Sequence, residues 1–334
     1  MATTSEPEPP SFSGSITQTN LVSSIDGMDA SHEASIDFIT ELPTQVGLWT
    51  IYVEGNTTPH NNGVSAKVEG SNADSGSAFN AQDEGRLQVS GLHLTSPFSN
   101  GAFQLGLMDL TSTFDNSTVA NDETSQFLSS ELINNAAIPF PDYTLGGAIK
   151  YEQPKDRSLA FHAAIGHSNG LSDNPNKSYS ELFDIFSREK GIFAITELAW
   201  NSAVITRVGI WHRSSVYYNE NTNEHQVSGL YSSIDSTQSQ WAWNIRLGTS
   251  LNNRENSLQF FSVAIDHPLG NGKLGLGSSI THQKQNSTIL SHQLFESYYQ
   301  HLFGSIQGSF SLQWRNQDNI GALWIAGLRF NFVY

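Results

Sequence analysis

The last stretch of the chain, IGALWIAGLRFNFVY at residues 320–334, decides the fold class. In a β-strand, successive side chains point to opposite faces. One face of this stretch therefore carries mainly large apolar side chains, and the other is small or polar at most positions. The apolar face consists of Trp324, Ala326, Leu328, Phe330, Phe332 and Tyr334, and the opposite face of Ile325, Gly327, Arg329, Asn331 and Val333.

The alternation continues to the final residue, which favours a membrane barrel over a soluble β-sandwich. The last residues of a soluble domain are commonly frayed and polar. The closing strand of an outer-membrane barrel must instead present an apolar face to lipid and a polar face to the lumen, with no free edge. Because a single strand is a weak signal, a soluble β-protein is the alternative at this point.

Composition is compatible with a barrel and excludes several other classes. The chain has 334 residues, no cysteine and a net charge of -16, and its mean hydropathy is -0.33. No apolar run approaches 18 residues, so no transmembrane helix is predicted, whereas barrel strands escape such a search because half of each faces water. The absence of cysteine excludes disulfides and thiolate metal sites. The negative charge argues against nucleic acid binding and fits solvated acidic loops.

The N-terminus differs from the rest of the chain. Residues 1–12 are polar and proline-rich and lack the basic and apolar regions of a signal peptide. We interpret residues 1–12 as a flexible N-terminal segment and residues 13–334 as a single outer-membrane β-barrel domain. Either the protein is not exported, or the sequence is a mature form without its signal, in which case Met1 is an added start residue.

Alternation between turn residues predicts about sixteen antiparallel strands, and an even number places both termini on one side of the barrel. Counting back from a periplasmic C-terminus puts the long loops on one side and the short turns on the other, as in outer-membrane barrels. A further short strand is predicted at 64–68. The long loops are 56–83, 110–142, 168–190 and 215–223, and the turns are 43–45, 97–100, 154–157, 235–238 and 268–272.

The segment 109–142, called the constriction loop below, is the longest excursion. Its residues 122–133 have apolar side chains at helical spacing, and Pro139 and Pro141 stiffen its return to the wall. A sixteen-stranded barrel leaves a wide channel unless something fills it, so we expect this loop to fold inward and narrow the pore. The alternative is a lid on the outer rim. The constriction residues that we expect are Asp115, Asp122, Glu123, Phe127, Pro139 and Phe140, with the acids meeting Arg207 or Arg246.

A second long loop, 168–190, also carries a helix signal. Ser178 and Glu181 have capping-box spacing ahead of Leu182, Phe183 and Phe186. The sequence therefore predicts a short helix there.

The candidate pore-lining residues are those on the strand faces opposite the apolar, lipid-facing side chains. Charged side chains on the lipid face would cost about 2–4 kcal/mol at the bilayer midplane, so we place them toward the lumen. There they either line water as paired charges or bind polyol hydroxyls, with Trp211 or a loop aromatic as a stacking platform. The candidates for pore lining or substrate binding are Glu197, Arg207, Trp211, Arg213, Arg246, Glu296, Gln313, Arg315 and Arg329.

The sequence shows no catalytic or metal-binding pattern. There is no nucleophile elbow, no phosphate-binding loop and no pair of histidines at helical metal-ligand spacing. Outer-membrane hydrolases with a serine nucleophile are a conceivable class, but no serine is singled out here. We therefore expect no enzyme activity, no cofactor and no metal.

Several short motifs, taken in order, resemble the carbohydrate-selective porins of the OprB type. The resemblance runs from about residue 33 to the C-terminus. The motifs are Phe127-Leu128 followed by NAAIPFP at 135–141, GIFAITELAW at 191–200, VGIWH at 208–212, ESYY at 296–299, SLQW at 311–314 and GLRF at 327–330.

This resemblance implies a sixteen-stranded, mostly monomeric outer-membrane barrel of a Gram-negative bacterium. It further implies passage of neutral sugars through a constriction lined by arginine and glutamate. The chain departs from the family in its strong acidity, its shorter length and the lack of a proline beside Gln313. Its expected partners are membrane lipid and small solutes, with a monomer expected and a trimer left open. The alternatives are a cation-preferring general porin, or a non-conducting barrel that acts as a structural protein, an adhesin or a sheath for an electron-transfer partner.

Overall fold

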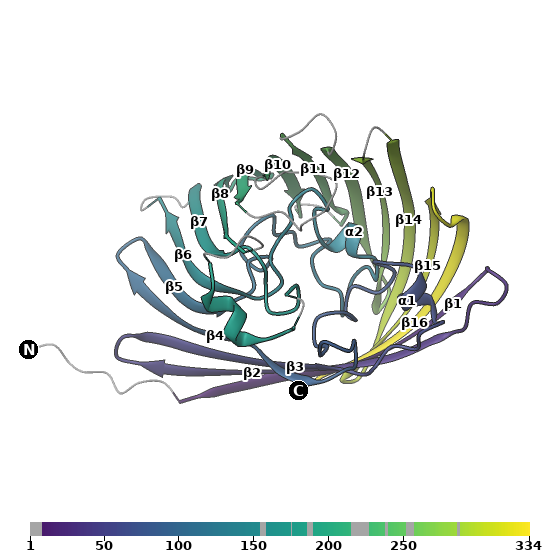
Figure 1. Cartoon of the computed structure of the whole chain (residues 1–334), viewed down its shortest axis with the longest axis horizontal. Coiled ribbons are helices and arrows are strands. Elements are labelled where there is room, and N and C mark those ends of the chain that lie inside the picture. Colours follow the sequence, from purple (N-terminus) through teal and green to yellow (C-terminus); the bar gives the residue numbers. More distant parts are fainter. Residues whose placement is uncertain are drawn as a thin grey trace, which may run out of the picture.

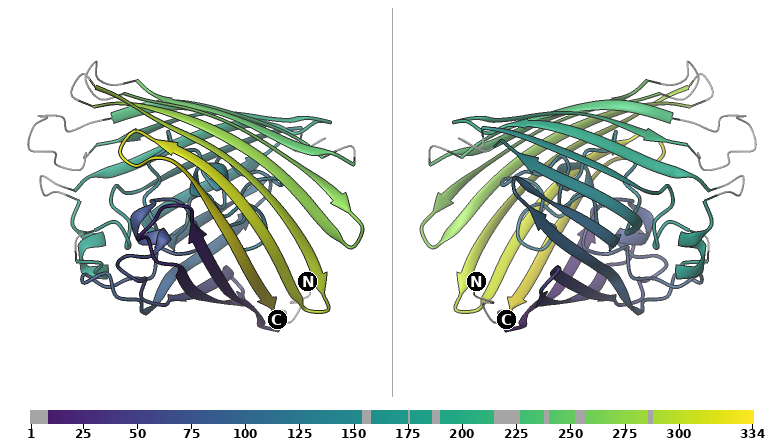
Figure 2. Two further views of the ribbon diagram at one scale, coloured as in Figure 1. Left: turned by 90° about the vertical axis from the view of Figure 1, so that its right-hand side faces the viewer. Right: turned by 90° about the vertical axis from the view of Figure 1, so that its left-hand side faces the viewer.

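Sixteen antiparallel strands close into one barrel in the computed structural model of the chain (Figure 1). The structure describes residues 9–153, 158–174, 176–185, 190–214, 227–237, 240–251, 257–285 and 288–334. Each strand pairs with the next along the chain, and the last pairs with the first, with Ser15 opposite Val333. The strands are tilted relative to the barrel axis (Figure 2), as barrel closure requires. The predicted closed antiparallel barrel is confirmed.

The elements of the barrel follow one another without crossovers. No helix in the described part of the chain is long and apolar enough to cross a membrane. The strands are β1 (Ser11–Ser23), β2 (Ser31–Thr44), β3 (Gly47–Asn56), β4 (Leu87–Phe98), β5 (Gly101–Met108), β6 (Thr144–Glu152), β7 (Leu159–His167), β8 (Ile192–Trp200), β9 (Ile205–Arg213), β10 (Val227–Ser236), β11 (Ala242–Ser250), β12 (Ser257–Leu269), β13 (Gly272–Gln285), β14 (Thr288–Phe303), β15 (Ile306–Gln317) and β16 (Gly321–Val333). The helical turns are α1 (Val64–Lys67), α2 (Ser130–Ile133) and η1 (Tyr179–Phe183).

The predicted number of about sixteen strands is confirmed, with one correction to the further short strand. Where a strand was predicted at 64–68, residues 64–67 form the helical turn α1 and Val68 follows as its C-cap; Val64 and Val68 are both fully buried. Residues four apart lie on one side of a helix, and a short apolar pattern is ambiguous between strand and helix. The barrel itself begins at Ser11, whereas the sequence places its start at residue 13. Residues 1–8 and the predicted loop 215–223 lie outside the described residues.

The helices in the loops are shorter in the structure than the ranges over which the sequence shows helical spacing. In the constriction loop only Ser130–Ile133 is helical, because the Asp122 carboxylate accepts hydrogen bonds from the backbone N–H groups of Thr124 and Ser125 and holds a turn there. The predicted helix after Ser178 is confirmed as η1. Phe186, which the sequence adds to this helix, lies outside the described residues.

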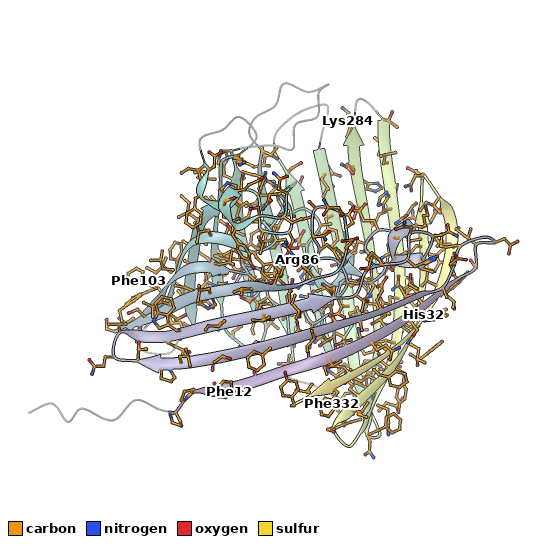
Figure 3. The ribbon with its side chains drawn as sticks, turned by 60° about the horizontal axis from the view of Figure 1, so that its bottom comes forward. Phe12, His32, Arg86, Phe103, Lys284 and Phe332 are labelled. Atoms are coloured by element: carbon orange, nitrogen blue, oxygen red, sulfur yellow. The ribbon has the colours of Figure 1, made fainter. Side chains whose placement is uncertain are left out.

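The two faces of the wall follow the sequence pattern. On β16, Trp324 is 47% exposed and Phe330 is 42% exposed, whereas Arg329 is 1% exposed. Phe103 and Phe332 project away from the barrel (Figure 3). The large apolar side chains thus form the outer surface, as the lipid-facing surface of a membrane barrel requires.

The hydrophobic core of this barrel lies inside the lumen. The constriction loop and parts of the segments 57–86 and 168–191 occupy the interior (Figures 1 and 2). Apolar side chains of the constriction loop pack on inward-facing wall residues, and the Phe127 ring meets the Tyr298 ring edge-on with centroids 4.9 Å apart. Leu128 packs with Leu323 and Ile325 of β16. Burial of these side chains favours the inward position, so the predicted inward-folded loop is confirmed.

Candidate functional site: the barrel lumen

Carboxylates of the wall bind backbone N–H groups of the constriction loop. An irregular segment has no strand partners, so its buried backbone groups need other hydrogen-bond partners. Glu296 of β14 accepts hydrogen bonds from the N–H groups of Leu128 (2.7 Å) and Ser129 (3.0 Å). Glu197 of β8 accepts one from the N–H of Asp115 (2.8 Å). Each carboxylate therefore fixes a specific turn of the loop.

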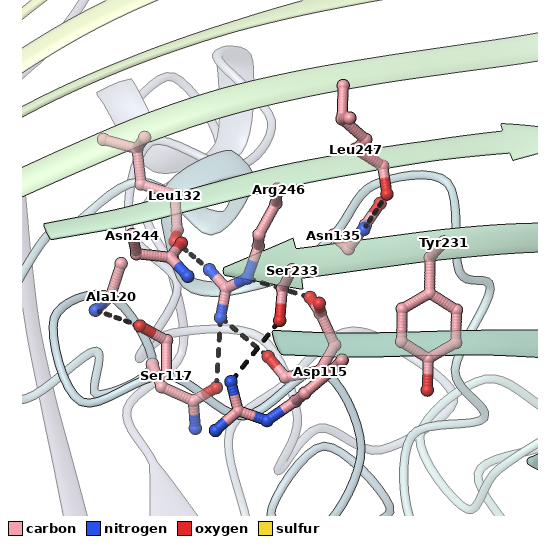
Figure 4. Close-up of polar contacts among 12 residues, drawn as sticks. Asp115, Ser117, Ala120, Leu132, Asn135, Tyr231, Ser233, Asn244, Arg246 and Leu247 are labelled. Atoms are coloured by element: carbon pink, nitrogen blue, oxygen red, sulfur yellow. Dashed lines mark hydrogen bonds and ion pairs between the residues drawn. The ribbon is translucent and has the colours of Figure 1, made fainter. Parts of the chain in front are cut away.

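Arginines of the same wall bind the loop carbonyl groups. Arg246 of β11 donates to the carbonyl oxygens of Leu132 (2.8 Å) and Asp115 (2.9 Å), and its Nε lies 2.9 Å from the Asp115 carboxylate (Figure 4). Arg329 of β16 donates to the carbonyl oxygens of Glu123 and Gln126 (2.6 Å). A guanidinium carries five donors in a fixed planar arrangement, which suits it to serve several carbonyl groups at once.

Arg315 of β15 joins two inward segments to the wall. Its Nη2 donates to the Glu131 carboxylate (2.8 Å) and the Ser129 hydroxyl (2.7 Å) in the constriction loop. The same guanidinium donates to the carbonyl oxygens of Glu69 (3.0 Å) and Gly70 (2.7 Å) in the segment 57–86. We call the inward face of β8, β11 and β14 to β16 the docking wall.

The nine predicted lining residues are inward but are covered by the loops. Eight of them are at most 6% exposed, and the Arg207 side chain is 12% exposed and paired with Asp235. Trp211 belongs to a buried cluster with Phe114 and Tyr231, so its ring is engaged in packing. Arg213 donates to the Asn169 amide oxygen (2.8 Å) in the segment 168–191. Their contact with a permeating solute stays a prediction.

The predicted acids of the constriction loop have three different roles. Asp115 meets Arg246, as the sequence led us to expect. Asp122 instead caps its own turn, and Glu123 engages Arg329 through its backbone carbonyl. Burial raises the pKa of the Glu123 carboxyl to about 8.

Strands β2 and β3 carry acidic residues toward the lumen, and sequence reasoning missed their role. Glu33 and Glu54 are 5% and 6% exposed, and the Tyr52 hydroxyl donates to Asp37 (2.7 Å) and to Glu54 (3.1 Å). Tyr143 also donates to Glu54. We call this face the acidic wall. Glu33 and Asp37 lie on the same face of β2, and apolar residues lie on its other face. This alternation is a signal in the sequence that could have identified them as inward-facing.

A polar cavity of about 480 Å³ lies between the segment 57–86 and the constriction loop. None of the described residues that line it is basic. Burial raises the pKa of the Asp142 carboxyl well above its usual value, and the charges of Asp173 and Glu54 raise it further. Its lining includes Glu69, Asn72, Asp109, Glu131, Phe140 and Asp142, and Pro139 borders it as well. We call it the acidic cavity.

The described residues contain no cluster of three histidines or carboxylates placed to hold a metal ion. The donor groups of the lumen are instead spread along two walls and two loops.

The sequence matches no protein-family model, but it is similar to a curated protein. That relative is an uncharacterized protein of Aquifex aeolicus (strain VF5), 25% identical over 229 residues, which are 69% of this chain. The match spans 63% of the relative, which is less than two thirds of its length.

Solved structures of outer-membrane porins share the fold. A high-pH structure of OprB from Pseudomonas putida has a TM-score of 0.72 at 11% identity, with 97% of this chain and 94% of that chain covered. An anion-selective porin from Comamonas acidovorans has a TM-score of 0.65 at 10% identity, with 98% and 100% covered. OmpF of Salmonella typhi, in complex with daunomycin, has a TM-score of 0.65 at 8% identity, with 97% of each chain covered. The chain therefore has the closed sixteen-stranded fold of outer-membrane porins, with its lumen partly filled by its own loops.

Proposed function

We propose that the protein is a diffusion channel in the outer membrane of a Gram-negative bacterium and passes small hydrophilic solutes, chiefly neutral carbohydrates. The observation that carries this proposal is the acidic cavity inside a porin-type barrel. The cavity combines carboxylate and amide oxygens with the Phe140 ring, and hydroxyl groups and the faces of sugar rings are bound by such groups.

The charge of the lumen supports discrimination between solutes. The docking-wall arginines are occupied by loop carbonyl groups and loop carboxylates, whereas no basic residue among those described lines the acidic cavity. In a narrow passage with low-dielectric walls, unneutralised carboxylates repel anions and attract cations. Neutral sugars and small cations should therefore pass more readily than anions of the same size.

A second candidate function follows from the filling of the lumen. Three inward segments with buried apolar anchors would also suit a non-conducting barrel, such as a structural protein, an adhesin or a sheath for an electron-transfer partner. The proposed membrane partner is lipid on the apolar outer face, and the proposed oligomeric state is a monomer.

Conductance and solute uptake distinguish the two candidates. The refolded protein should give stepwise single-channel currents in a planar bilayer. In a salt gradient, the sign of the reversal potential should show that the channel prefers cations to anions. Liposomes that contain it should swell faster in neutral sugars than in sugar acids of similar size. A folded barrel without current or swelling would favour the non-conducting candidate, and a clear anion preference would contradict the proposed selectivity.

A further inference from the structure

The acidic cavity has a lining that is not explained by passive permeation of neutral sugars alone. Four of its lining residues are carboxylic acids: Glu69, Asp109, Glu131 and Asp142. Among the described residues, only Glu131 of these four forms an ion pair with an arginine, Arg315. The carboxylate of Asp109 instead accepts hydrogen bonds from the N–H (2.8 Å) and hydroxyl (2.6 Å) groups of Thr111.

We infer that this cavity binds solutes that carry both an ammonium group and several hydroxyl groups, such as amino polyols and amino sugars. This inference rests on the proposed channel function and assigns a solute class to the same lumen. Three further features of the cavity support it: an amide oxygen without a partner, an aromatic ring and the dispersal of its acids.

The unpartnered amide oxygen belongs to Asn72. Asn72 lines the cavity and is 5% exposed, and its amide nitrogen donates to the Glu33 carboxylate (2.8 Å). Its amide oxygen has no hydrogen-bond partner among the described residues. A buried acceptor without a partner is costly, so a ligand that donates an N–H or O–H there would be favoured.

Phe140 provides an apolar surface beside these acceptors. Its ring centroid lies 6.1 Å from that of Phe193, and the side chain also lines the cavity. An aromatic face attracts an ammonium group and the C–H surface of a polyol. Acceptors and one aromatic face are therefore available to the same solute.

The arrangement favours an organic cation over a metal ion. The cavity has a volume of about 480 Å³, within the range of about 300–1,000 Å³ for small-molecule pockets. A Ca²⁺ ion would instead need six to eight oxygens converging at about 2.3–2.6 Å. The described residues hold no group of three histidines or acids placed in that way.

Three probes with similar six-carbon polyol skeletons test the inference: glucamine, sorbitol and gluconate, which carry positive, zero and negative charge at neutral pH. We would measure their binding to the detergent-solubilised full chain by calorimetry, and their interruption of single-channel current in a planar bilayer. Glucamine should bind about tenfold more tightly than sorbitol, and gluconate should bind more weakly than both. Putrescine, which has ammonium groups without hydroxyls, should bind more weakly than glucamine.

Charge-neutral variants locate the site. Asp109→Asn keeps an acceptor for Thr111, and Glu69→Gln changes an exposed side chain, so neither removes a contact with an arginine side chain. Each should weaken glucamine binding several-fold and sorbitol binding by a smaller factor, because the variant loses one charge but keeps hydrogen-bonding groups for hydroxyls. The matched control is Asp26→Asn, an exposed acid in the turn between β1 and β2, which should change neither.

Equal binding of glucamine and sorbitol, or unchanged glucamine binding in both cavity variants, would overturn the inference. Putrescine binding as tight as glucamine binding would overturn the requirement for hydroxyl groups. A conducting channel without glucamine preference would leave the proposed function intact. Conversely, glucamine binding by a barrel that carries no current would support the site and contradict the channel function.

Discussion

The docking wall and the acidic wall face the same lumen, but among the described residues only the docking wall forms ion pairs with the loops that pack on it. On the docking wall, Glu296 binds loop N–H groups, and Arg246 and Arg315 bind loop carbonyl groups and loop carboxylates. On the acidic wall, Glu54 is held by hydroxyl and amide groups that bring no positive charge. Charged wall residues can therefore serve either to fix a loop or to create a field, and their partners decide which.

Deletion of Asn116–Asn134 should have the largest effect, because it removes most of the loop that distinguishes the docking wall from the acidic wall. The deletion removes the groups that Glu296 binds and the apolar anchors Phe127 and Leu128. Single-channel conductance should rise several-fold by a rough cross-section argument, because the lumen widens. Unchanged conductance in a correctly folded deletion variant would show that the constriction loop does not set the narrowest point.

Arg315→Met should loosen the attachment of the constriction loop to the wall, which is a smaller change than deleting part of the loop. It leaves the Glu131 carboxylate without its arginine and removes donors to two segments, and loss of one partner of a buried ion pair costs about 3–5 kcal/mol. We expect a lower thermal midpoint and faster proteolysis in the constriction loop. Arg86→Met is the matched control, because the Arg86 side chain bonds only to Gln88 among the described contacts. Equal destabilisation by both variants would contradict the special role of Arg315.

Glutamine substitutions on the two walls should differ in effect. In Glu296→Gln only one side-chain oxygen is left to accept from Leu128 and Ser129, which should cost about 1–3 kcal/mol. Glu54→Gln removes a buried charge without a cationic partner, so its cost should be smaller or absent. Denaturant unfolding of the two variants measures the difference. Similar losses would mean that the two carboxylates are equally structural.

Acidification should have the smallest effect of these changes. It should lower the cation preference of the channel by protonating carboxyls near the acidic wall and in the acidic cavity. Burial raises the pKa of Asp74 to about 7, while Ser35 donates to its carboxylate (2.7 Å) and Asp37, Glu54 and Arg329 contribute charge nearby. Between pH 8 and pH 5 this carboxyl gains a proton, so reversal potentials should show lower cation preference. Asp142 faces Asp173, Glu54 and Asp109, and its raised pKa adds in the same direction.

The same shift predicts the pH dependence of stability. An unfolded aspartate has a pKa of about 4, so between about pH 4 and pH 7 the folded protein holds more protons at Asp74 than the unfolded chain. The contribution of Asp74 to stability therefore falls as pH rises through this window. Asp74→Asn should flatten that part of the stability profile. An unchanged profile would show that the Asp74 carboxyl titrates normally.

The sequence by itself determined the barrel. Alternation along 320–334 and along the other strands depends only on local geometry, because each strand residue faces either lipid or lumen. Inward placement of Arg246, Arg315, Glu197 and Glu296 followed from the same parity together with the cost of charge in lipid. The inward fold of the constriction loop followed from its apolar content.

Only the tertiary structure decided what those inward residues contact. Arg315 meets Glu69 and Gly70 across about 245 residues of chain, and no local pattern specifies such a pair. Leu323 and Ile325 face inward although they are apolar, because Leu128 covers them. Strand parity fixes the side to which a residue points, whereas its partner depends on how irregular loops satisfy their backbone groups inside the lumen.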